Sequence, residues 1–167
     1  MSLERYLKYI HTVRYLKVQQ IFGRVIRPFK NVNTTPVVGL VIREPVKSFT
    51  PVRLNKRSMY ESGRFVFLNE TGVLAEWNDP QRSKLWLYNL HYFDDLNSGD
   101  ASTRYEQHQG LIRRWIEENP PVFGNGWEPY PVSLRIVNWI KWFLYHGHAE
   151  QSHLSSLGLQ SKVLMQT

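Results

Sequence analysis

The chain of 167 residues carries 21 lysine and arginine residues against 14 acidic residues, which gives a net charge of +7, and it contains no cysteine. A hydrophobic fraction of 42% with a charged fraction of 21% is typical of a folded domain and excludes an intrinsically disordered chain. The absence of cysteine excludes disulfides, thiolate zinc sites and cysteine nucleophiles.

The charge is distributed unevenly along the chain. Residues 1–57 hold 12 basic and 2 acidic side chains, for +10, whereas residues 58–167 hold 9 basic and 12 acidic ones, for −3. A basic segment can bind polyanions such as nucleic acid, anionic lipid or acidic polysaccharide, although a solvated basic face is the simpler explanation. No run of about 18 apolar residues occurs and no signal-peptide pattern opens the chain, so we expect no membrane span. We therefore expect a cytoplasmic protein, with a periplasmic location as the alternative.

The first 62 residues form a basic helical segment followed by a connector. Apolar residues recur every three or four positions over residues 3–29, which predicts one or two amphipathic helices. Prolines and asparagines interrupt residues 30–62, where only residues 37–42 have the pattern of a strand.

The remaining residues, 63–167, read as a β-hairpin followed by helices. We expect strands over residues 64–68 and 73–77, joined by a turn over residues 69–72. A helix over residues 83–96 begins at a Ser83 cap. Three further helices are expected over residues 103–119, from Pro131 to a stop at Gly147, and over residues 149–166.

Two histidine groups suggest chemistry. His91 lies three and four positions before Asp94 and Asp95, so on a continuous helix they would share a face as a general base with its orienting carboxylate. A local hydrogen bond is the simpler interpretation, and no third ligand is spaced to complete a metal site. We attribute the second group, His146, His148 and His153, to chance, and we expect neither a metal nor a cofactor.

Aromatic and polar side chains gather in two segments, residues 85–96 and 125–142. Such a combination is typical of a sugar-binding cleft, although a dense aromatic core explains the 14% of aromatic residues equally well. Arg135 can form a bidentate pair either with Glu128, as a buried structural contact, or with the carboxylate of a uronic acid. The candidate substrate-binding residues are Asn89, His91, Tyr92, Trp127, Glu128, Tyr130 and Arg135.

These two segments resemble signatures of the heparinase II/III-like polysaccharide lyases. The first reads LWLYNLHYFDDL and the second NGWEPYPVSLRIVNWIKW, and YIHTVRYLKVQQIFGR at residues 9–24 is similar to the opening of the same bacterial proteins. The resemblance implies a mainly α fold, namely an incomplete (α/α) toroid beginning at residue 63 with a small β-hairpin on its amino-terminal side. It also implies β-elimination on an acidic polysaccharide that contains uronic acid, such as a glycosaminoglycan.

Members of that family are several times longer, and the residues that perform catalysis in them follow the segment that resembles residues 155–167. We therefore assign no catalytic residue, expect the missing carboxy-terminal half as a partner, and leave open whether the chain is an enzyme by itself. A non-catalytic carbohydrate-binding or scaffold module in bacterial polysaccharide metabolism is the alternative. Nucleic-acid binding is supported only by the charge of residues 1–57, far from the aromatic segments, and we expect no nucleic-acid partner.

Overall fold

The computed structural model describes residues 31–43, 49–50 and 56–167. The chain divides into two compact units, and the unit considered below comprises Asn33–Gln166. The helices expected over residues 3–29 lie outside the described residues.

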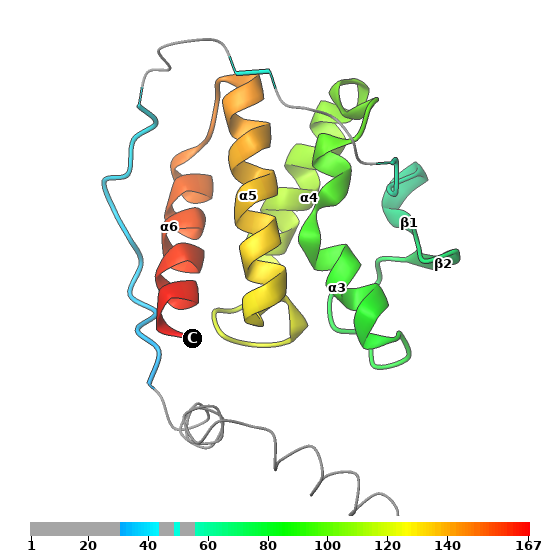
Figure 1. Ribbon diagram of the computed structural model, residues 1–167, viewed down its shortest axis with the longest axis horizontal. Helices are drawn as coiled ribbons and strands as arrows, with labels where there is room; N and C mark the ends of the chain where they lie inside the picture. Colours follow the sequence, from blue (N-terminus) through cyan, green and yellow to red (C-terminus); the bar gives the residue numbers. More distant parts are fainter. Residues whose placement is uncertain (1–30, 44–48, 51–55) are drawn as a thin grey trace, which may run out of the picture. The chain divides into compact units, whose positions relative to one another are not determined.

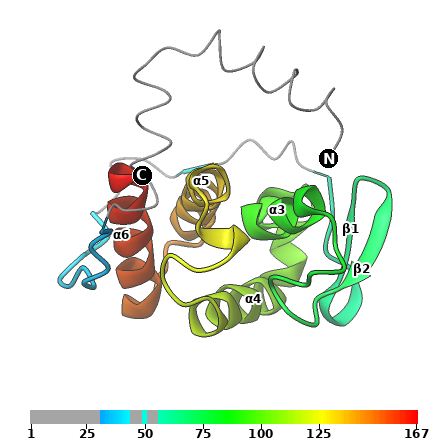
Figure 2. The ribbon, with the colours of Figure 1, turned by 90° about the horizontal axis from the view of Figure 1, so that it is seen from below.

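The described unit is mainly helical, as expected, with a small antiparallel hairpin. Its strands and α-helices are β1 (Arg64–Phe67), β2 (Glu70–Val73), α3 (Lys84–Tyr92), α4 (Tyr105–Glu118), α5 (Pro129–His146) and α6 (Gln151–Gln166). Four 3₁₀ turns connect them: η2 (Glu61–Gly63), η3 (Asp94–Asn97), η4 (Ala101–Arg104) and η5 (Asn125–Trp127). Helix α5 contacts both α3 and α6, and it lies between them in Figure 1. Figure 2 shows α4 below α5 and α3, and α4 also contacts α6. None of the helices in this part of the chain combines the length and hydropathy that a bilayer crossing needs.

The hairpin forms with a different register from the one expected. Leu68 and Asn69 both adopt positive φ, at 53° and 65°, and make a two-residue turn that starts β2 at Glu70 rather than at Val73. Gly72, expected in the turn, lies within β2 instead. A Cβ at Gly72 would lie 2.5 Å from the Trp86 ring, so the glycine allows the hairpin to pack closely on α3.

Capping residues explain the helix ends. The Ser83 hydroxyl accepts a hydrogen bond from the Trp86 amide at 3.2 Å, which confirms the predicted cap of α3. The helix ends at Tyr92, four residues earlier than expected, because Phe93 adopts a left-handed conformation with φ 61°. Gly147 ends α5 with φ 66°, as predicted.

The strand expected over residues 37–42 does not form. Residues 33–41 instead make an irregular strap along α6, because their contacts are with helix side chains rather than with another strand. The Asn33 amide donates to Gln166 Oε1 at 2.8 Å, and Lys162 Nζ donates to Asn33 Oδ1 at 2.9 Å. A Cβ at Gly158 would lie 2.7 Å from Leu40, so a helix position without a side chain receives the strap.

The core is built largely from aromatic rings. Trp86, Trp115, Trp139 and Trp142 are each at most 2% exposed. Trp139 meets Trp115 edge-on, with ring centroids 5.6 Å apart, and thereby joins α5 to α4. Much of the aromatic content is therefore used in packing.

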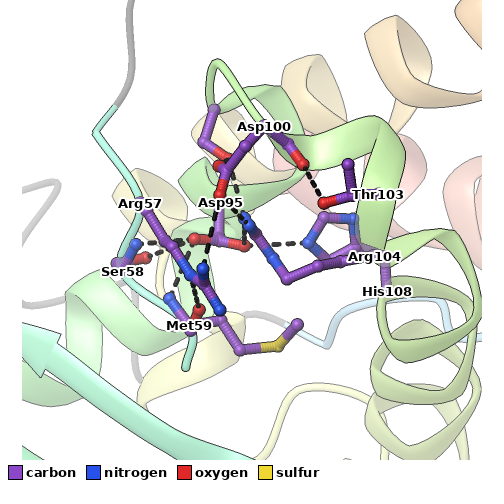
Figure 3. A network of polar contacts seen from close by, with 9 residues as sticks. Arg57, Ser58, Met59, Asp95, Asp100, Thr103, Arg104 and His108 are labelled. Carbon is purple, nitrogen blue, oxygen red and sulfur yellow. Dashed lines mark hydrogen bonds and ion pairs between the residues drawn. The ribbon is translucent and has the colours of Figure 1, made fainter. Parts of the chain in front are cut away.

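One buried carboxylate connects the segment before the hairpin to the helices. Figure 3 shows Ser58 and Met59 on one side of Asp95, with Arg104 and His108 on the other. Asp95 Oδ1 accepts the backbone amides of Ser58 and Met59 at 2.6 and 2.8 Å. Its Oδ2 accepts Arg104 Nη2 at 2.6 Å and His108 Nε2 at 2.8 Å. We call these five residues the Asp95 clamp.

The clamp sets the ionisation of its carboxyl group. Burial by itself raises the pKa of Asp95, but the hydrogen-bond donors around the carboxylate outweigh burial and lower the pKa to about 2. Because the folded pKa lies below the ordinary value of 3.8, the ionised carboxylate stabilises the fold above about pH 4. This contribution of about 2 kcal/mol is lost as the pH falls from about 4 towards 2.

We expect Asp95→Asn to lower the free energy of unfolding by about 3 kcal/mol, because the buried Arg104 loses the buried one of its two carboxylate partners. Urea denaturation at pH 7 measures the loss. Asp100→Asn is the matched control, since Asp100 also pairs with Arg104 but its side chain is 43% exposed, and it should cost less than about 1 kcal/mol. Equal losses for the two variants would contradict a central role for Asp95.

Candidate functional site: a tyrosine surface on helices α3 and α5

The seven candidate substrate-binding residues divide between the core and the surface. His91, Tyr92, Trp127 and Arg135 are buried, Asn89 and Glu128 are half-buried, and Tyr130 is 60% exposed. The division follows the helical period, because α3 and α5 each turn one side to the core and another to solvent.

His91 is held inside the core as a neutral ring. Its Nε2 donates to the Trp77 carbonyl at 3.1 Å, and its Nδ1 accepts the Trp115 indole N–H at 3.1 Å. Burial, with a smaller contribution from the nearby Arg135 charge, lowers the pKa of His91 to about 3. Both ring nitrogens are therefore engaged, and the ring has no access to solvent.

The expectation that His91 shares a helix face with Asp94 and Asp95 is wrong. The left-handed Phe93 ends α3 between the histidine and the two carboxylates, so the three side chains no longer follow one helical period. Asp95 enters the clamp, and Asp94 accepts a hydrogen bond from Asn138 Nδ2 at 2.7 Å. No group of three potential metal-ligating side chains comes together among the described residues.

Arg135 is fully buried, but its partners are not the predicted ones. Its Nε donates to Gln160 Oε1 at 2.8 Å and its Nη1 to the His91 carbonyl at 3.3 Å. The guanidinium lies 3.8 Å from the centroid of the Trp115 ring. Arg135 thus joins α5 to α3, α4 and α6, and the predicted pair with Glu128 is wrong.

Trp127 and Asn89 have local structural contacts. The Trp127 indole N–H donates to the Asn119 carbonyl at 3.3 Å within the core. Asn89 Nδ2 donates to the Leu85 carbonyl at 2.8 Å, one turn earlier in α3.

The remaining candidates form a surface together with two residues of α3. Lys84, Tyr88 and Tyr92 are spaced by four residues, so they share one face of α3 over about 12 Å. Glu128 and Tyr130, at the start of α5, lie against this face. We call Lys84, Tyr88, Tyr92, Glu128 and Tyr130 the tyrosine surface.

Polar and aromatic contacts hold this surface together. Lys84 Nζ lies 2.8 Å from Glu128 Oε1, and the Tyr88 hydroxyl donates to Glu128 Oε2. The Tyr92 and Tyr130 rings meet edge-on with centroids 5.6 Å apart, and Tyr88 lies 6.3 Å from Tyr92. Aromatic rings and hydrogen-bonding groups therefore lie next to each other here, with Tyr130 the most exposed of the rings.

Both phenols of α3 remain protonated at neutral pH. Burial, and secondly the hydrogen bond to Glu128, raises the pKa of Tyr88. Burial, with smaller contributions from Tyr130, Tyr88 and Asp94, raises the pKa of Tyr92 to about 12. These hydroxyls can donate hydrogen bonds but are poorly suited to remove a proton from a substrate.

The start of α5 is shaped by two prolines. Pro129 and Pro131 lack amide hydrogens, so this helix start presents fewer free N–H donors than usual. A ligand at this helix start would therefore meet side chains rather than backbone amides.

Lys84 and Tyr88 were missed by the sequence analysis. The signal was their spacing of four residues from each other and from Tyr92, which predicts one shared helix face. Comparison of the chain with models of protein families, with curated proteins and with solved structures found no match in any of the three.

Alanine should have opposite effects at two glycines, because Gly126 packs against His91 and Gly110 has open space beside it. An added Cβ at Gly126 would lie 2.6 Å from His91 Nδ1, so Gly126→Ala should lower the free energy of unfolding by about 1–3 kcal/mol. Gly110 lies within α4 with no heavy atom within 4 Å of its added Cβ, so Gly110→Ala should raise it by about 0.5–1 kcal/mol. Urea denaturation of both variants checks the two signs, and stabilisation by Gly126→Ala would contradict the contact with the ring.

The pKa of His91 predicts that the fold loses stability in mild acid. The folded pKa of about 3 lies below the ordinary 6.5, so the unfolded state binds the extra proton between these values. The free energy of unfolding should fall by about 1.4 kcal/mol per pH unit below pH 6 through this residue. Burial also lowers the pKa of His153, which adds a contribution of the same sign. NMR titration should find His91 neutral at pH 5, and protonation of the folded ring near pH 6.5 would contradict this assignment.

Proposed function

We propose that the unit of Asn33–Gln166 is a carbohydrate-binding portion of a heparinase II/III-like polysaccharide lyase. In this proposal it forms one wall of the cleft in an (α/α) toroid, and its partner is an acidic polysaccharide that contains uronic acid. The tyrosine surface carries the proposal, because it combines an exposed ring, two protonated phenols and a lysine–glutamate pair. The role of this surface is to bind and orient the polysaccharide.

A second candidate is a carbohydrate-binding module that takes no part in catalysis. It is favoured by the ionisation of the groups near the surface, since the raised pKa values keep Tyr88 and Tyr92 protonated at neutral pH and so unavailable as general bases. His91, whose pKa is about 3, is enclosed by the core. Both candidates require the tyrosine surface to bind glycan, and they differ in whether the unit belongs to a protein that also cleaves the polymer.

Removing the most exposed ring tests glycan binding. We expect Tyr130→Ala to weaken binding of heparin, heparan sulfate or hyaluronan by roughly fivefold or more, because truncation of an aromatic contact residue costs about 1 kcal/mol or more. Isothermal titration calorimetry on the full chain measures the change. Tyr145→Ala is the matched control, since Tyr145 is a 39% exposed tyrosine at the other end of α5.

The same mixtures report whether the chain cleaves the polymer by itself. A rise in absorbance at 232 nm reports the unsaturated uronic acid that β-elimination produces, so its appearance supports a lyase and excludes the module. Binding without a rise is what both the module and a non-cleaving portion of a lyase predict. If none of the three polysaccharides binds, or if Tyr145→Ala weakens binding as much as Tyr130→Ala, the proposed function is wrong.

A further inference from the structure

The charges of the tyrosine surface bear on which sugar unit it accepts. Lys84 is the cation of this surface, and its side chain is 62% exposed. Its ammonium group already lies 2.8 Å from the Glu128 carboxylate, which is 38% exposed. An acidic sugar that approached Lys84 would therefore compete with a carboxylate belonging to the protein.

Glu128 engages the neighbouring phenol as well. The Tyr88 hydroxyl donates to the second carboxylate oxygen of Glu128. An ammonium and a phenol O–H are the donors that a sugar carboxylate would use. Glu128 takes the single O–H of Tyr88 and offsets the charge of the Lys84 ammonium.

A second carboxylate, that of Asp94, lies near enough to contribute, after burial, to the raised pKa of Tyr92. Asn138 Nδ2 donates both to the Tyr92 backbone carbonyl at 2.9 Å and to Asp94 Oδ1 at 2.7 Å, which holds the Asp94 carboxylate in place. A negatively charged group placed against Tyr92 and Tyr130 would thus be near the negative charges of Glu128 and Asp94, although Lys141 offsets part of the Asp94 charge. Repulsion from both disfavours an anion at this position.

We infer that the tyrosine surface binds an uncharged sugar unit and that Glu128 is the residue that discriminates against an acidic one. This inference rests on the proposed glycan-binding function and deepens it. The acidic units of the same polysaccharide would lie next to that neutral unit, outside the tyrosine surface. The surface then sets the register of a mixed polymer by the place of its neutral unit.

Two probes with the same backbone test the inference. Cellohexaose and the hexamer of β-1,4-linked glucuronic acid differ in the carboxylate at each C6 position. Calorimetry on the full chain gives the ratio of their dissociation constants. We expect the wild type to prefer cellohexaose, with a preference that shrinks as salt is added.

Two variants should move that ratio in opposite directions. Glu128→Gln keeps an acceptor for Tyr88 but removes the charge, and should shift the ratio towards the acidic hexamer by roughly two- to fivefold. Lys84→Gln removes the cation and should shift it towards cellohexaose by a similar factor. Glu117→Gln, at an exposed position on α4, makes the same charge change and should leave the ratio unaltered.

The outcomes separate failure of the inference from failure of the proposed function. Glycan binding that depends on Tyr130, together with a ratio that Glu128→Gln does not change or moves towards cellohexaose, overturns the inference alone. A wild-type preference for the acidic hexamer does the same. The absence of any binding by the wild type, to these hexamers and to the acidic polysaccharides, overturns the proposed function as well. Circular dichroism melts establish that each variant is folded, and Lys84→Gln supplies the test if Glu128→Gln is not.

Discussion

The carboxylate of Asp95 is the contact on which the described unit depends most. It is buried, and it binds two backbone amides from residues 58 and 59 on one side and the Arg104 and His108 side chains on the other. Each of these donors would be expensive to bury without a partner, and the carboxylate would be equally expensive without the donors. The segment before the hairpin, the turn after α3 and the start of α4 are therefore fixed together.

The need to pair buried polar groups also fixes how α3 is turned. On its inner side His91 is locked between Trp77 and Trp115, while Arg135 reaches its backbone carbonyl from α5. This double attachment fixes the rotation of α3 about its own axis. The outward face is thereby determined too, so the buried polar network positions the tyrosine surface without contacting any ligand.

Much of the helical architecture could be predicted from the sequence, because caps and breakers act locally. Ser83 and Gly147 function as their residue types suggest. The errors occurred where tertiary contacts decide. Gly72 was expected in the turn, but it allows close packing against Trp86. Phe93 adopts a left-handed conformation that no local sequence pattern predicts. In the candidate site, helical spacing could not distinguish which polar residues face the core, so Arg135 was paired with the wrong partner.

The strap along α6 also restricts when this part of the chain can fold during synthesis. Asn33 and Gln166 are separated by 133 residues along the chain, yet their groups are hydrogen-bonded. At about 5–20 residues per second, a ribosome needs roughly 7–27 seconds to make the intervening chain. During that time Val37 and Leu40 have no α6 to contact, and their apolar surface is available to chaperones. The strap, made early, can take its final place only when one of the last segments of the described unit has emerged.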